Sequence, residues 1–96
     1  MLNNRQKAFL RALGNTERSI FQVGKDGISD NLISGLSDGL KAHELVKFNL
    51  LKSCPLSANE AAVTVASKTQ SEIVQIIGRT IILYKKNPEG KIKLPR

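Results

Sequence analysis

Apolar and polar residues follow two different periods along the chain, which predicts that helices and strands alternate. The helical period of three to four residues recurs in three segments: residues 2–13, 30–43 and 58–69. A period of two, or a short apolar run, marks four predicted strands: residues 18–23, 45–52, 72–77 and 80–85. We therefore expect an α/β fold of order α-β-α-β-α-β-β, with a mixed four-stranded sheet and helices packed on at least one face.

Local capping signals predict where the helices begin and end. Ser57 and Glu60 form an S-x-x-E capping box at the start of the third helix. Ser29 or Asp30 is the expected N-cap of the second helix. Gly14 is expected to end the first helix, because glycine favours the conformation that follows a helix C-terminus.

The sequence Gly-Lys-Asp-Gly at residues 24–27 lies between the first predicted strand and the second predicted helix. A turn is the simpler interpretation. The alternative is a backbone clamp for a phosphate chain, since glycine lets that chain approach and a helix N-terminus favours an anion. KH domains use such a G-x-x-G loop to clamp several nucleotides. Lys25 would add a phosphate contact, whereas Asp26 opposes phosphate and would instead help to cap the following helix.

The expected topology would bring this loop close to other cations. Only Gly78 and Arg79 separate the last two predicted strands, and a two-residue Gly-X loop favours a type II′ hairpin. If the first three strands are parallel, as short right-handed crossovers would make them, their C-terminal ends share one sheet edge. Residues 24–27, Lys52 and the hairpin turn would then meet at that edge.

The overall charge indicates a polyanionic partner. The chain has 15 Lys and Arg against 8 Asp and Glu, a formal net charge of +7 at pH 7. Nucleic acid is the first interpretation and an anionic membrane surface the second. Residues 85–96 carry +4 of this total, which leaves a mild +3 for the rest. We expect one domain in residues 1–86 and a loose basic tail in residues 87–96.

A catalytic or metal-binding constellation cannot be assembled from the sequence. Cys54 and His43 are the only residues of their types, too few for a structural zinc site. His43 is interpreted as a helix-end residue that bonds a carbonyl or packs on the sheet, and Cys54 as a structural or incidental thiol. Acidic residues are scattered and a Walker A motif is absent. We expect no enzyme activity, cofactor, metal or small-molecule substrate.

A single cysteine favours a reducing compartment, because no internal disulfide is possible. The N-terminal residues have no signal-peptide core, and no stretch approaches the roughly 20 apolar residues of a membrane span. We therefore expect a soluble, cytoplasmic protein without membrane contact.

Aromatic residues are few. The four are Phe9, Phe21, Phe48 and Tyr84. The phenylalanines lie on stripes expected to face the core, and Tyr84 is expected to be more open on an edge strand. With few stacking platforms, we expect recognition of shape and backbone more than of individual bases.

Four segments together resemble the CRM domain family, the YhbY-like small RNA-binding proteins. They are "LNNRQKAFLRAL" at 2–13, "VGKDGIS" at 23–29, "LKAHELVK" at 40–47 and "VQIIGRTIILY" at 74–84. The resemblance extends over nearly the whole chain, and the last two segments are the most specific. It implies a fold similar to the C-terminal domain of translation initiation factor three.

The resemblance also implies RNA binding without catalysis, in precursors of the large ribosomal subunit. The expected partner is ribosomal RNA, bound by a monomer. The alternative is a protein-interaction module that docks on a ribosomal protein or assembly factor, with RNA contact secondary. The candidate RNA-binding residues are Gly24, Lys25, Asp26, Gly27, Arg5, Lys7, Arg11, Lys52, Gly78 and Arg79. Lys7, Arg11, Lys25 and Arg79 are expected to act mainly through phosphate.

Overall fold

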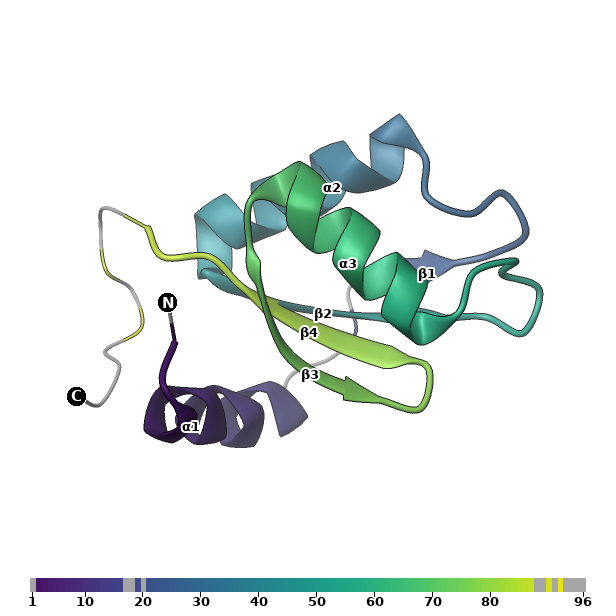
Figure 1. Ribbon diagram of the computed structural model, residues 1–96. Coiled ribbons are helices and arrows are strands. Elements are labelled where there is room, and N and C mark those ends of the chain that lie inside the picture. The colour runs from purple at the N-terminus through teal and green to yellow at the C-terminus, as the bar shows by residue number, and fades with distance from the viewer. Residues whose placement is uncertain (1, 17–18, 20, 88–89, 91, 93–96) are drawn as a thin grey trace.

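The computed structural model of the 96-residue chain describes residues 2–16, 19, 21–87, 90 and 92. Three helices and four strands follow in the predicted order (Figure 1). They are α1 (Asn4–Asn15), β1 (Phe21–Val23), α2 (Asp30–His43), β2 (Leu45–Leu50), α3 (Ala58–Thr69), β3 (Glu72–Ile77) and β4 (Thr80–Tyr84). Among the residues described, no helix has the length and apolar character needed to cross a membrane.

The strands form one mixed sheet in the order β1-β2-β4-β3. β1 pairs with β2 in parallel, and β4 is antiparallel to both β2 and β3. β1, β2 and β3 therefore run in the same direction, although β4 separates the last two. Their C-terminal ends share one edge of the sheet, which confirms the arrangement predicted from short crossovers.

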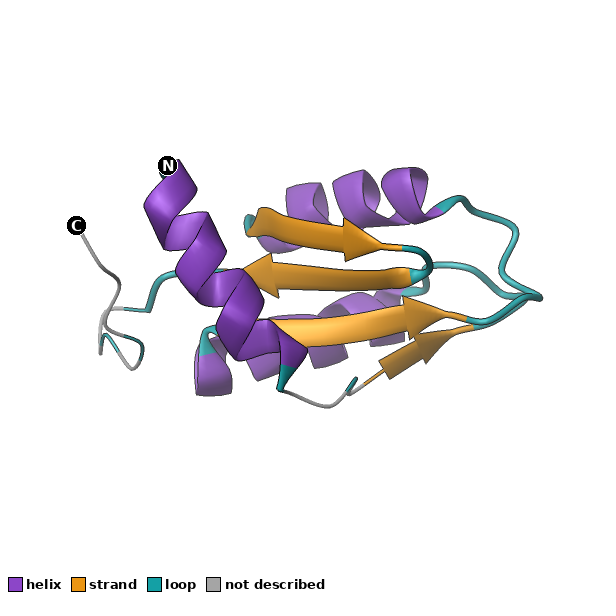
Figure 2. Cartoon of the chain, turned by 90° about the horizontal axis from the view of Figure 1, so that it is seen from below, coloured by secondary structure: helices purple, strands orange, loops and turns teal. Residues whose placement is uncertain are grey.

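The sheet lies between two layers of helices. Figure 1 shows α2 and α3 on one face of the sheet and α1 on the other. Figure 2 is seen from the α1 side and shows this helix lying across the strands. Alternate residues of β4 follow this division: Ile81 and Leu83 pack with α2 and α3, whereas Ile82 and Tyr84 pack with α1. Such alternation is the expected result of the strand period of two.

Two glycines allow helices to approach the sheet closely. A methyl group on Gly35 of α2 would lie 2.6 Å from Cζ of Phe21, and one on Gly14 of α1 would lie 2.8 Å from Cδ1 of Ile82. Gly14 was expected to end the first helix, but α1 continues to Asn15. Gly14 is instead buried where the helix meets the sheet, a tertiary contact that a local stop signal does not reveal.

Most other boundaries agree with the capping signals. Ser57 and Glu60 form the predicted reciprocal capping box, and Ser29 is the N-cap of α2. α1 begins two residues later than expected because Asn3 accepts a hydrogen bond from the Gln6 backbone. Of the strand expected over residues 18–23, residues 18 and 20 lie outside the described part, and β1 is Phe21–Val23. β2 and β4 end before the predicted limits, at Leu50 and Tyr84.

A fully buried acidic residue, Glu44, connects the sheet to the C-terminal segment. The residue is 0% exposed, and its backbone has a positive φ of 65°. The Tyr84 hydroxyl donates to Oε2 at 3.3 Å, and the Asn87 backbone N–H donates to the same oxygen at 3.4 Å. The Ile92 N–H donates to Oε1 at 2.9 Å. Burial, reinforced by the Glu44 carboxylate, raises the pKa of Tyr84 above its ordinary value.

The segment after Lys86 was expected to be loose, yet two of its described residues are attached to the body. Asn87 Nδ2 donates to the carbonyls of Leu40 and Lys41 at 3.2 and 2.6 Å, near the end of α2. Ile92 packs against the buried side chains beneath α1, among them Leu10 and Tyr84, and its N–H donates to Glu44. The composition of this segment predicted a loose tail. Composition could not show that a buried carboxylate far away in the sequence, that of Glu44, accepts hydrogen bonds from it.

Replacing Glu44 with alanine should destabilise the fold and release the C-terminal segment. The Tyr84 hydroxyl would stay buried without its acceptor, and an unsatisfied buried group costs about 1–3 kcal/mol. Urea unfolding should show a loss of that size, and proteolysis should cut the C-terminal segment faster. Glu44→Gln is the matched control, because it keeps an acceptor oxygen and should lose less. Equal stability of the alanine variant and the unaltered protein would contradict this role.

Candidate nucleic-acid interface

Three loops meet where β1, β2 and β3 end, and together we call them the loop edge. They are the turn at residues 24–27, the connection at residues 51–57 and the hairpin turn at residues 78–79. The Leu51 N–H donates to the Val23 carbonyl at 2.9 Å, and the Leu50 N–H donates to the Arg79 carbonyl at 2.7 Å. These hydrogen bonds hold the loops in fixed relation to one another.

The Gly-Lys-Asp-Gly segment is a β-turn. The Gly27 N–H donates to the Gly24 carbonyl at 3.0 Å, the i to i+3 hydrogen bond of such a turn. Lys25 and Asp26 form its exposed tip. Asp26 does not cap α2 as the sequence suggested, because Ser29 is the N-cap of that helix.

The two glycines of this turn serve different physical purposes. Gly27 has φ +67°, a left-handed conformation that glycine adopts without strain. Gly24 does not have a positive φ angle. A methyl group built on it would lie 3.7 Å from both Leu51 Cδ1 and Ser53 Oγ. That distance is ordinary contact, so the fold tolerates a side chain at Gly24. The absence of one leaves the backbone accessible from outside.

The loop edge gathers cations from separate parts of the chain. Lys25, Lys52 and Arg79 are exposed and belong to its three different loops. Gly78, with φ +57°, sits at the first central position of the hairpin, as a type II′ turn requires. The sequence argument therefore predicted correctly that residues 24–27, Lys52 and the hairpin turn would come together.

The other three candidate cations lie elsewhere. Arg5, Lys7 and Arg11 belong to α1, on the sheet face opposite α2 and α3 (Figure 2). α1 packs against Leu45, Ile82 and Tyr84, which extend from the middle of the sheet to the end away from the loop edge. The structure thus separates the candidate residues into two groups.

A row of polar residues occupies the sheet face between these two groups. Gln22 is paired with Asn49, and Asn49 with Thr80, across three neighbouring strands. Their chain neighbours Phe21, Phe48 and Ile81 pack with α2 and α3, so the polar row is on the α1 side. Its position depends on strand order and register, which no local sequence signal specified.

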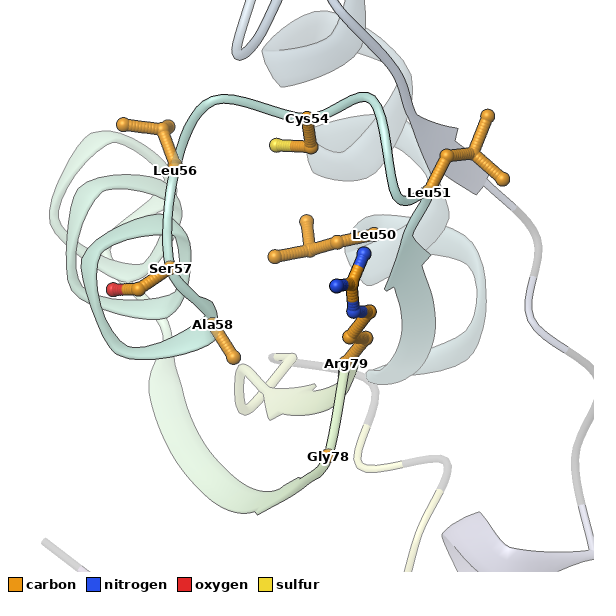
Figure 3. A pocket seen from close by; sticks show the side chains of 8 residues that line it. All are labelled: Leu50, Leu51, Cys54, Leu56, Ser57, Ala58, Gly78 and Arg79. Carbon is orange, nitrogen blue, oxygen red and sulfur yellow. The ribbon is translucent and has the colours of Figure 1, made fainter.

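A small pocket opens within the loop edge and was not anticipated from the sequence. Its volume is about 130 Å³, and Figure 3 shows the eight residues that line it. Leu50, Cys54 and the Arg79 guanidinium point inward, whereas Leu51 and Leu56 point away. Ser57 and Ala58, at the start of α3, complete the wall.

Two expectations about aromatic residues are wrong. Tyr84 is 3% exposed rather than open, because β4 is an inner strand and not an edge strand. Phe9 is 41% exposed rather than core-facing, although Phe21 and Phe48 do pack in the core as expected. No described aromatic residue lines the pocket of the loop edge, which leaves Arg79 as its only planar side chain.

Comparisons with known proteins agree over almost the full length. The family model of the CRS1 / YhbY (CRM) domain matches residues 2–85. The Bacillus subtilis "Probable RNA-binding protein YqeI" is 43% identical over 96 residues, which cover 99% of this chain and 100% of that protein. An "RNA-binding protein" of Haemophilus influenzae is 27% identical over 95 residues, covering 99% and 96%. The solution structure of the hypothetical protein SAV1595 from Staphylococcus aureus matches with TM-score 0.80 and 38% identity, covering 99% of this chain and 100% of that one.

Proposed function

Because the chain belongs to the CRS1 / YhbY (CRM) domain family, we propose that it is a non-catalytic RNA-binding protein. Its RNA would be ribosomal RNA in precursors of the large ribosomal subunit, bound by a monomer in the cytoplasm. The observation that carries the proposal is the loop edge, where an accessible backbone turn adjoins Lys25, Lys52 and Arg79. The names of the relatives support RNA as the class of partner.

The proposed contact is made mainly with the RNA backbone. A phosphate oxygen is an acceptor only, and the loop edge offers it exposed cations and close access to the main chain at Gly24. Asp26 at the turn tip opposes phosphate, so the RNA would pass on the Gly24 side of the turn. Backbone contacts position a protein without specifying sequence, which suits docking on a folded precursor.

In cell lysate, the protein should sediment with immature large ribosomal subunits and be scarce on translating ribosomes. A sucrose gradient probed for the tagged protein, at low and at raised salt, tests this. Raised salt should release it, because phosphate contacts weaken steeply with added salt. Persistent association at raised salt would instead favour docking on a ribosomal protein or assembly factor. Absence from every ribosomal fraction at low salt would overturn the ribosomal role.

A further inference from the structure

We propose that the pocket of the loop edge receives one pyrimidine base of a single-stranded RNA whose backbone lies on the turn at residues 24–27. The inference rests on the proposed function and adds a preference among bases to it. Eight residues form the pocket, from the stretch 50–58 and from the hairpin turn at 78–79, and the Arg79 guanidinium points into it (Figure 3).

The size of the pocket suits a single ring. Its volume is about 130 Å³. A cavity of about 150 Å³ is known to hold a benzene molecule, so the space here is close to that of one six-membered ring. The two fused rings of a purine require more room. The pocket therefore accommodates the ring of a pyrimidine more fully than the fused rings of a purine.

The lining has the chemistry of a base site. Leu50, which is 4% exposed, forms an apolar floor against which a ring face can lie. The Arg79 guanidinium points into the same pocket (Figure 3), and a planar guanidinium stacks on bases. It also carries only donors, which match the carbonyl oxygen that both pyrimidines present. Arg79 is thus assigned to a base, in place of the phosphate role expected from the sequence.

A neutral ring fits this pocket better than a phosphate group does. Ser57 and Ala58 belong to the start of α3, where a helix dipole would ordinarily favour an anion. Here the Glu60 carboxylate accepts from the Ser57 backbone N–H at 3.3 Å, and Ser57 Oγ accepts from the Glu60 backbone N–H at 3.1 Å. The capping box thus uses two donors of the first turn and brings a carboxylate close to the wall.

The pocket and the turn are near enough for one nucleotide strand to use both. Leu51 lines the pocket, and its Cδ1 lies 3.7 Å from the methyl position of Gly24. The Leu51 N–H also bonds the Val23 carbonyl, directly before the turn. A strand that follows Gly24 with its phosphates can therefore direct a base toward Leu50.

Cys54 provides a direct measure of occupancy, because its thiol points into the pocket and it is the only cysteine in the chain. The test is the rate at which N-ethylmaleimide alkylates Cys54 in the full chain, with oligouridine, oligoadenosine or an abasic oligonucleotide of equal length at saturation. Oligouridine should slow alkylation at least about five-fold, in line with the energy of one stacked base. The other two oligonucleotides should protect much less.

Two variants of α3 separate the pocket from its surroundings. Ala58→Leu places bulk in the pocket wall, whereas Asn59→Leu introduces the same leucine side chain at the exposed neighbouring position. The first should abolish the affinity preference for oligouridine over oligoadenosine, and the second should keep it. Thermal unfolding of both variants verifies the fold. Arg79→Lys, which keeps the charge, should also lose the preference while retaining the salt dependence of binding.

The outcomes distinguish the two proposals. RNA binding with equal protection by all three oligonucleotides, or an unchanged preference in Ala58→Leu, would overturn the base pocket and leave the proposed function intact. If the unaltered protein binds no RNA of any sequence, both proposals fail. The expected result is stronger protection by oligouridine than by the other two oligonucleotides, with an affinity preference for oligouridine that Ala58→Leu loses and Asn59→Leu keeps.

Discussion

Replacing Gly24 with valine should lower RNA affinity by about 10- to 100-fold while leaving the unfolding temperature nearly unchanged. The position accepts a side chain, since a methyl group there meets Leu51 and Ser53 only at contact distance. A bulkier group would keep RNA phosphate away from the main chain. Hydrogen bonds to charged groups contribute about 1.5–3 kcal/mol each, so the loss of one accounts for the expected range.

Gly27 supplies the comparison, because its role in the turn is conformational. Gly27→Val should destabilise the protein by about 1–2 kcal/mol, the cost of a left-handed backbone for a residue with a side chain. Gly27→Asn should lose less, since asparagine tolerates that conformation. RNA affinity and thermal unfolding are measured on the same samples. Undiminished affinity in a folded Gly24→Val protein would end the idea of a backbone clamp.

The element order and several boundaries could be predicted because their signals are local. The capping box at Ser57 and Glu60 uses residues three apart, and the Gly78 turn is specified by two residues. Such features depend on dihedral preferences and nearby hydrogen bonds, which a short segment carries within itself. The meeting of the three loops at the loop edge could then be predicted from one further expectation, that β1, β2 and β3 run in the same direction.

What the sequence did not predict depends on strand order. Placing β4 between β2 and β3 buries Tyr84, and it brings Glu44 within reach of Asn87 and Ile92. A glutamate directly after a helix looks exposed in the sequence, because acidic side chains rarely are buried without partners. The partners here come from 40 to 48 positions away along the chain. Local periodicity contains no information about them.

The pocket was missed for a related reason. Its wall combines the end of β2, the following loop, the start of α3 and the hairpin turn. Cys54 was interpreted from the sequence as a structural or incidental thiol, and that interpretation gave no reason to expect a cavity beside it. The candidate cations were likewise predicted as a set, but their division between two regions required the position of α1.

This division predicts that RNA length decides which cations matter. The loop edge and the far end of the sheet are separated by β2, whose six residues span about 20 Å. A tetranucleotide, the length that a G-x-x-G loop clamps in KH domains, should contact the loop edge alone. Replacing Lys25 and Lys52 with alanine should lower the salt slope by about 1.4 and the affinity at 0.1 M salt by roughly 25-fold, if each contacts one phosphate.

A longer RNA can cross the polar row of Gln22, Asn49 and Thr80 and reach α1. Replacing the three cations of α1, Arg5, Lys7 and Arg11, with alanine should therefore weaken binding of the longer RNA and leave the affinity for the tetranucleotide unchanged. The matched control replaces Lys41 and Lys68, which are exposed near the ends of α2 and α3 away from the loop edge. It removes as much charge as the Lys25 and Lys52 variant, but at a distance of about two screening lengths. If the control weakens tetranucleotide binding as much as the loss of Lys25 and Lys52, the attraction comes from net charge and the loop edge is not the binding site.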